Sequence, residues 1–132
     1  MNTKTYREKK TFHPYDDGHF IVYLQEKIIS KWVPDTNPGE EKTPDACTGY
    51  SYTGPELDGG TIIGCNSCDR DSLINGIIRS KYSQTEEDAI KTHQIILLKD
   101  STCSKADDYN TEWNEFEAFR TEAISQVDSW LS

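Results

Sequence analysis

Long apolar runs are missing from this sequence. The longest, Phe20–Leu24 and Ile95–Leu98, are far shorter than the roughly 20 residues that span a bilayer as a helix. Residues 1–10 are polar and basic, unlike the hydrophobic centre of a signal peptide. The sequence therefore predicts a soluble protein with no membrane segment and no secretion by a signal peptide.

Sequence motifs that carry catalysis are also absent. The chain has no G-x-S-x-G, no phosphate-binding P-loop, no H-E-x-x-H and no dinucleotide-binding fingerprint. Its acidic clusters, Asp16-Asp17 and Glu86-Glu87-Asp88, are explained by a turn and by the first turn of a helix. We therefore expect no catalytic residues and no enzymatic activity.

Basic residues are scarce: 14 Lys and Arg stand against 23 Asp and Glu, giving a formal net charge of −9. This charge repels a phosphate backbone, which argues against nucleic acid as a ligand. Residues 1–10 are the exception, because their four basic side chains face Glu8 alone. This segment is either a basic arm that docks on an acidic neighbour, such as another copy of the chain, or a solvated terminus.

Cysteine is limited to four residues. Cys65 and Cys68 form a C-x-x-C pair that can present two thiolates to tetrahedral zinc, with Cys47 and either Cys103 or His93 completing the set. A second C-x-x-C pair is missing, so reduced thiols packed near a loop are the alternative. A thioredoxin-like redox site is not expected, because no βαβ context of strand, C-x-x-C and long helix surrounds the pair. Zinc is the one cofactor that the sequence suggests.

The chain from residue 11 to about residue 33 is rich in β-branched and aromatic residues, in the runs FIVYL and KIISKWV. Gly18, within YDDGH, can supply the positive φ of a turn between two strands. Residues 34–45 concentrate Pro, Gly, Asn and acids, which is typical of a surface loop. Tyrosines that alternate with polar residues in GYSYTG, and a DGG turn before Thr61, predict a second β segment.

Helix signals begin at Asp69 or Asp71, either of which can cap a helix that ends near residue 81. Ser83 and Glu86 then have the S-x-x-E spacing of a capping box, which predicts a tight corner and a second helix reaching about residue 98. The second helix is expected to carry an apolar stripe formed by Ala89, Ile90, His93, Ile96 and Leu97.

From Asp107 onward the spacing of apolar residues predicts one long helix. Its stripe is formed by Tyr109, Trp113, Phe116, Arg120, Ala123, Val127 and Trp130, widened by Phe119, Ile124 and Leu131. Shorter helices of the chain can cover part of this stripe and a partner subunit the remainder. The candidate interface residues are Trp113, Phe116, Phe119, Trp130 and Leu131, because aromatic anchors dominate interface energetics. We expect Trp113 and Phe116 to lie in the core, and Trp130 and Leu131 to be the interface candidates.

These signals together predict an α+β fold in a single domain. A small N-terminal antiparallel sheet precedes a three-helix bundle or helical hairpin with a long last helix. The expected parts are a basic arm at 1–10, a β-rich half at 11–68 with the Pro-rich loop 34–45, and a helical half at 69–132.

The helical half resembles a known family. The residues that carry the resemblance are Leu73-Ile74, Ile77-Ile78-Arg79, Lys81-Tyr82-Ser83, Glu86-Glu87, Ala89-Ile90, Tyr109-Asn110 and Phe116. This series looks like the helical C-terminal region of small proteins encoded in phage tail gene clusters, such as the tail-cluster proteins of PBSX-like defective prophages. The residues from Lys91 to Gln94 and the loop from Lys99 to Asp108 depart from that pattern, and the β-rich half has no counterpart in it.

The resemblance implies a phage-associated, non-catalytic role. We expect a structural or adaptor component of a bacteriophage virion, in the tail, a fibre or the head–fibre attachment, made in the host cytoplasm. Its partners would be other phage structural proteins, within a homo-oligomer or symmetric assembly. A non-virion chaperone for fibre or tail assembly and a small zinc-binding interaction module are the alternatives.

Overall fold

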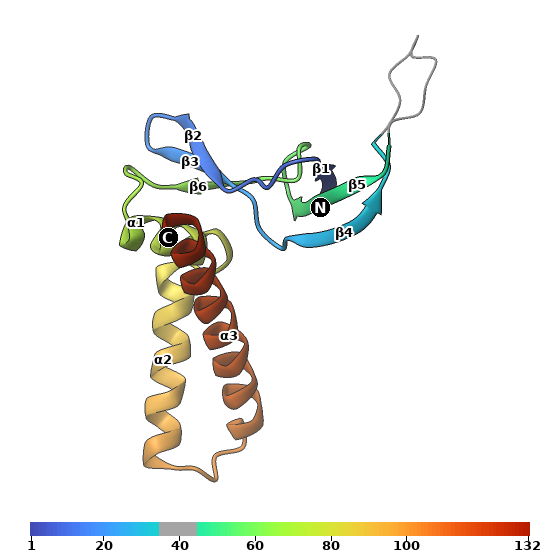
Figure 1. Cartoon of the computed structure of the whole chain (residues 1–132). Helices are drawn as coiled ribbons and strands as arrows, with labels where there is room; N and C mark the ends of the chain where they lie inside the picture. The colour runs from blue at the N-terminus through green and yellow to red at the C-terminus, as the bar shows by residue number, and fades with distance from the viewer. Residues whose placement is uncertain (35–44) are drawn as a thin grey trace. The chain divides into compact units, whose positions relative to one another are not determined.

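The structure, a computed structural model, describes residues 1–34 and 45–132. Within these residues six strands are followed by three helices, which confirms the predicted α+β fold (Figure 1). The strands are β1 (Asn2–Tyr6), β2 (Phe12–Asp16), β3 (His19–Val22), β4 (Lys27–Trp32), β5 (Cys47–Gly54) and β6 (Thr61–Gly64), and the helices are α1 (Arg70–Lys81), α2 (Gln84–Lys99) and α3 (Ala106–Leu131). The predicted Pro-rich loop 34–45 lies, apart from its two end residues, outside the described part.

The chain divides into two compact units, residues 1–62 and 63–132. The strands form two three-stranded antiparallel sheets rather than one, with the orders β1-β5-β4 and β2-β3-β6. The three helices all belong to the second unit.

Residues 2–6 form strand β1. The sequence had suggested a basic arm or a solvated terminus in this segment. This strand pairs with β5 in antiparallel register, from Asn2 opposite Gly54 to Tyr6 opposite Tyr50. Thr3 and Thr53 add a hydroxyl–hydroxyl hydrogen bond of 2.8 Å across the pair. Threonine and tyrosine favour a pleated, half-buried surface, and this preference outweighs the basic charge of the segment.

Left-handed backbone occurs at several positions of the first unit. Gly18 has φ 81° in the turn between β2 and β3, as the sequence predicted. Gln25 has φ 55° in the corner between β3 and β4, a conformation that costs a non-glycine residue about 1 kcal/mol. Lys31 has φ 59° at a register shift in β4, which is an edge strand of its sheet.

The core of the first unit is built from aromatic side chains with polar tips. Ile21, Tyr23 and Tyr52 are buried, and the Tyr23 and Tyr52 rings meet edge to face at 5.6 Å. The Tyr23 hydroxyl donates to Asp58 Oδ2 at 2.8 Å, and the Tyr52 hydroxyl donates to Glu26 Oε1 at 2.7 Å. Burial, reinforced by these bonds, raises the pKa of both tyrosines, so they stay neutral hydrogen-bond donors.

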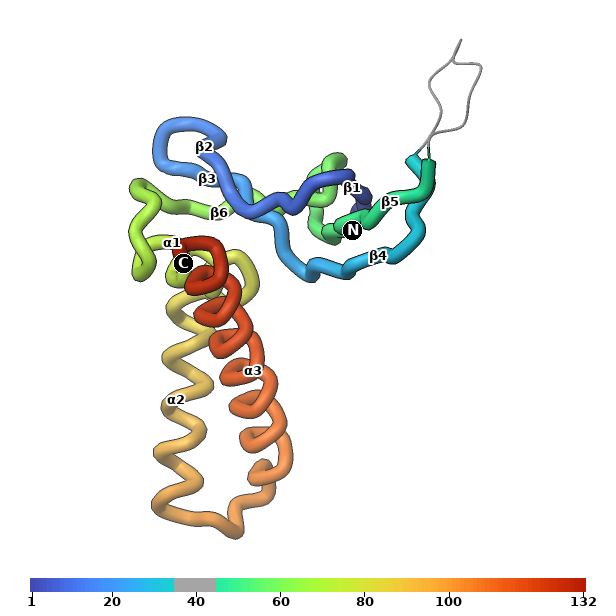
Figure 2. The backbone as a smooth tube through the Cα atoms, in the orientation of Figure 1, coloured from blue at the N-terminus to red at the C-terminus, as the bar shows by residue number. Residues whose placement is uncertain are grey.

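In the second unit α1 and α2 both pack against α3, which is therefore the central helix (Figure 2). Helices α2 and α3 run in opposite directions and form a hairpin (Figure 2). Asp69 is the N-cap of α1, where its side chain accepts a hydrogen bond from the Ser72 amide. The buried apolar side chains of the unit are Ile63, Cys65, Leu73, Ile77, Ile78, Ile90, Phe116, Ala123 and Val127.

Gly76 lets α1 approach the chain segment that precedes it. A Cβ at this position would lie 2.9 Å from the Gly64 carbonyl oxygen and 2.9 Å from Ile63 Cδ1. No side chain larger than hydrogen fits here without a shift of backbone. Gly76 therefore sets the packing distance of α1, although glycine is unfavourable in a helix interior.

Candidate functional site

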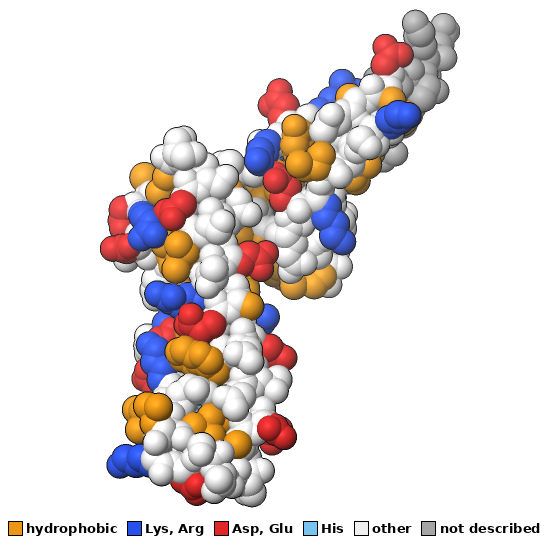
Figure 3. Space-filling view, turned by 60° about the horizontal axis from the view of Figure 1, so that its bottom comes forward, with side chains coloured by type: hydrophobic (Ala, Val, Ile, Leu, Met, Phe, Trp, Pro, Cys, Tyr) orange, Lys and Arg blue, Asp and Glu red, His pale blue; other side chains and the backbone are white. Residues whose placement is uncertain are grey.

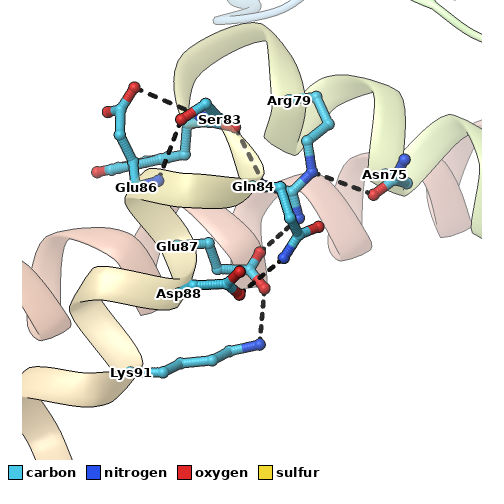
Figure 4. Close-up of polar contacts among 9 residues, drawn as sticks. Asn75, Arg79, Ser83, Gln84, Glu86, Glu87, Asp88 and Lys91 are labelled. Atoms are coloured by element: carbon cyan, nitrogen blue, oxygen red, sulfur yellow. Dashed lines mark hydrogen bonds and ion pairs between the residues drawn. The ribbon is translucent and has the colours of Figure 1, made fainter.

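The corner between α1 and α2 has the predicted capping box (Figure 4). Ser83 Oγ accepts a hydrogen bond from the Glu86 amide at 3.1 Å, and Glu86 Oε1 accepts from the Ser83 amide at 3.5 Å. Two amide groups that a helix start leaves without partners are thereby satisfied within one turn. These local bonds fix the start of α2.

A buried carboxylate joins the two helices across this corner (Figure 4). Glu87 is only 7% exposed; its Oε1 lies 2.6 Å from Arg79 Nη2 on α1 and its Oε2 lies 2.6 Å from Lys91 Nζ on α2. Arg79 also donates to the Tyr82 carbonyl at 3.2 Å. The hydrogen bond from Lys91 lowers the pKa of Glu87, and burial acts in the opposite direction. The hydrogen bond from Arg79 lowers the pKa further, so that it lies below the ordinary glutamate value. Glu87 therefore stays ionised and holds two cations in place.

The sequence reading missed this role of Glu87, because it assigned the three acids at 86–88 to the helix start. One signal for it was present. Glu87 and Lys91 are spaced i, i+4, with the acid on the N-terminal side, which is the favourable order on a helix. The ion pair with Arg79 spans the corner and has no such local pattern.

Tyr82, the residue in the corner, connects it to α3. Its ring meets Phe116 edge to face at 5.2 Å and lies 5.9 Å from the ring of Phe119. The Lys81 ammonium lies 4.9 Å from the centre of the Phe119 ring. The corner is thus held both by its own bonds and by aromatic packing on the central helix.

Further along the hairpin, His93 of α2 binds α3. Its ring stacks on Tyr109 at 4.1 Å with an interplanar angle of 10°, and its Nδ1 bonds the carboxylate of Glu112. Gln94 Nε2 donates to the Tyr109 carbonyl at 3.0 Å. The hairpin is therefore fixed toward its turn as well as at the corner.

Beyond this contact, α2 leaves apolar side chains in solvent. Ile95 is 55% exposed, Leu98 is 87% exposed and Ile96 is also exposed, whereas Leu97 is half-buried. Figure 3 shows hydrophobic side chains on the surface of the helical hairpin among charged ones. We call Ile95, Ile96 and Leu98 the apolar group of α2.

The exposed side chains show that the predicted apolar stripe of α2 is partly wrong. Ala89 and Ile96 were expected on that stripe and are exposed. Residues Glu87, Ile90, Gln94 and Leu97 are buried or half-buried instead, at the 3-4-3 spacing of one helix face. Four consecutive residues point in directions spread around a helix, so Ile95 to Leu98 cannot all face α3. In this structure three of the four are exposed.

The surface of α3 is strongly acidic. It carries the single base Arg120 among seven acids, which are Asp107, Asp108, Glu112, Glu115, Glu117, Glu122 and Asp128. Arg120 was expected in the apolar stripe of α3 but is exposed. Phe119, which precedes it, is half-buried in the same helical turn. Asp128 forms a two-point ion pair with Arg70 of α1, at 2.6 Å and 3.3 Å.

The predicted interface residues of α3 fall into different environments. Phe116 is 1% exposed and belongs to the core, so it is not available to a partner. Trp113, Phe119 and Trp130 are half-buried and Leu131 is exposed. An interface role of Trp130 and Leu131 stays a prediction, and Ile95 and Leu98 were not among the candidates.

The four cysteines lie on different elements of the chain. Cys47 lies on β5 of the first unit, and Cys103 lies in the turn after α2, about 24 Å of helix away from the corner. Cys65 Sγ donates to the Ser67 carbonyl at 2.8 Å, and burial raises the pKa of this thiol, which disfavours the thiolate that zinc needs. Among residues 1–34 and 45–132, no three His, Cys, Asp or Glu side chains are placed to hold a metal ion.

No protein-family model, curated protein or solved structure matches this chain. Within the described ranges, none of the helices combines the length and the apolar character needed to cross a membrane.

Proposed function

We propose that this chain is a non-catalytic structural or adaptor component of a bacteriophage virion, in the tail, a fibre or the head–fibre attachment. In this role its helices dock other virion proteins. The phage context rests on the resemblance of residues 73–116 to tail-cluster proteins. The docking role rests on one observation of the structure, the exposed apolar group of α2.

The apolar group is suited to docking because the hairpin beneath it is held at separate points. Glu87 and Tyr82 fix the corner, and His93 fixes α2 to α3 two residues before Ile95. A side chain on such a support loses little freedom when a partner covers it. Repeated contacts in a symmetric particle need a surface with one defined shape.

Burial of this group on a partner would supply a useful part of a binding energy. Complete burial of a leucine or isoleucine side chain contributes about 1.5–3 kcal/mol. Leu98 is 87% exposed, so a partner that covers it would gain almost all of this contribution. In a monomer, the same side chains only add unfavourable contact with water.

Peptide counting on density-purified phage particles tests the proposal, with this chain scored against the major capsid protein. Presence at a fixed ratio is expected, and the ratio distinguishes a vertex, a tail ring and a fibre. Abundance in the lysate with absence from particles contradicts a virion role. That result would instead favour a chaperone that assembles fibres or tails and then leaves.

Two leucine variants test the docking surface in the same assay. Leu98→Lys places a charge in the apolar group of α2 and should lower the number of copies per particle. Leu57→Lys is the matched control, because Leu57 is 89% exposed and lies in the first unit. Equal incorporation of both variants would remove the docking role from α2.

A further inference from the structure

We infer that the partner of the apolar group of α2 is a second copy of this chain, which binds α2 against α2 in antiparallel orientation about a twofold axis. The inference rests on the proposed function, because both assign docking to the same face of the hairpin. It goes further by naming the occupant of that face.

The outer face of α2 carries the residues that this contact would use. Asp88, Thr92, Ile95 and Lys99 are all exposed and follow a 4-3-4 spacing, which places them in one stripe along the helix. The buried and half-buried residues of α2 have a different phase and lie on the opposite side, against α3. The stripe therefore points away from the hairpin.

The order of residues in this stripe is complementary to itself when reversed. In an antiparallel pair centred between His93 and Gln94, Asp88 lies opposite Lys99 of the second copy, and Thr92 lies opposite its Ile95. The twofold axis repeats each of these contacts once. Leu98 and Ile96 border the stripe on its two sides. Opposite charges thus flank an apolar centre at both ends.

The side chains at these positions are available for the contact. In the part of the chain that the structure describes, Lys99 forms no ion pair, and Asp88 receives one side-chain hydrogen bond, from Gln84 at 3.0 Å. The Thr92 hydroxyl donates to the Asp88 carbonyl at 2.8 Å, within the helix. This bond satisfies its polar atom, so the methyl group can face Ile95 of the second copy.

Other arrangements of two copies bring like charges together. A parallel contact sets Asp88 against Asp88 and Lys99 against Lys99. A contact through the face of α3 that carries Asp108, Glu115 and Glu122, all exposed and spaced seven residues apart, sets acids against acids. Among these three contacts, electrostatic complementarity favours the antiparallel pair through α2.

The contact is small. Helix α2 has 16 residues and is about 24 Å long, so one such face covers less than the roughly 800 Å² per partner of a standard interface. We expect a reversible dimer with a dissociation constant on the order of 10 µM to 1 mM. Such an equilibrium would be pulled toward association where many copies are held in one particle.

Sedimentation equilibrium of the full chain tests the inference. The unaltered chain should show a monomer–dimer equilibrium that weakens as salt is raised. Asp88→Lys or Lys99→Glu alone places like charges at both ends of the contact and should weaken the dimer about tenfold. The double variant restores opposite charges with their positions exchanged, and its affinity should return to within about threefold of the original.

Glu122→Lys is the matched control, because it changes the net charge as much as Asp88→Lys does, at an exposed site of α3. It should not weaken the dimer. Circular dichroism of each variant checks that the helices remain folded, and the salt series on the unaltered chain needs no variant at all.

A chain that is monomeric at all concentrations, or a double variant no better than the single ones, overturns the inference. In a parallel dimer each single reversal would leave the pattern of like charges unchanged, so unweakened single variants overturn it too. Particle counting separates the two claims. A monomer found in particles at a fixed ratio contradicts only the self-association, and a dimer absent from particles contradicts only the virion role.

Discussion

Replacement of Glu87 by alanine should destabilise the helical unit by about 2–3 kcal/mol. The bond from Arg79 accounts for most of this value, since a hydrogen bond between charged groups away from water contributes about 1.5–3 kcal/mol. The Lys91 side chain is 54% exposed, so its i, i+4 pair with Glu87 adds only about 0.3–0.5 kcal/mol. The variant also leaves the Arg79 guanidinium, 25% exposed, without its carboxylate.

Urea unfolding followed by circular dichroism at 222 nm measures this loss, because the signal reports on the helices. A double-mutant cycle with Arg79→Met and Glu87→Gln isolates the coupling between the two side chains. We expect a coupling of at least about 1 kcal/mol. A loss below about 0.5 kcal/mol for Glu87→Ala, with no coupling in the cycle, would refute the assignment of Glu87 as the residue that locks the corner.

The same carboxylate should give the stability a pH dependence. The pKa of Glu87 is lowered in the folded state, so its contribution is present above pH 4.5, the ordinary glutamate value, and is lost as the pH falls through the folded value. The difference in unfolding free energy between the unaltered chain and Glu87→Gln should therefore shrink below pH 4.5. A difference that stays constant down to pH 2 would contradict this linkage.

Three further substitutions test the packing of the two units. Phe116→Ala should cost about 3–5 kcal/mol in urea unfolding, because the ring is 1% exposed and leaves a cavity; a cost below 1 kcal/mol would contradict its place in the core. Gly76→Ala should lower the melting temperature, because the new Cβ would meet the Gly64 carbonyl, even though alanine has the better helix propensity. A higher melting temperature would show that α1 can move. Tyr23→Phe should cost about 1–2 kcal/mol and raise the pKa of Asp58 in an NMR titration, because a donor to that carboxylate is lost; an unchanged Asp58 pKa would contradict the bond.

The sequence predicted the features that local residues determine. The capping box at Ser83 needs only residues within one helical turn, and the turn at Gly18 needs only its own φ, so both could be identified without tertiary information. Strand β1 was missed for the opposite reason. Its partner β5 lies about fifty residues away, and no local pattern indicates which distant strand a basic segment will join.

The outward face of α2 could not be deduced from periodicity alone. Different phases of the helix turn different members of the run from Ile95 to Leu98 inward. The packing of α2 on α3 selects the phase in which Leu97 is half-buried and the other three are exposed. The long side chain of Arg120 likewise extends to solvent where the stripe predicted an inward position. Surfaces for partners are decided by such tertiary choices, which the sequence leaves open.

The pairing of β1 with β5 also determines the order in which the chain can fold. The first sheet cannot close until Gly54 has left the ribosome, because Asn2 pairs with that residue. Contacts between such distant residues form slowly, since the intervening loop must close first. Helices α1 and α2, joined by a corner of local bonds, have no comparable delay and can form within microseconds of their synthesis.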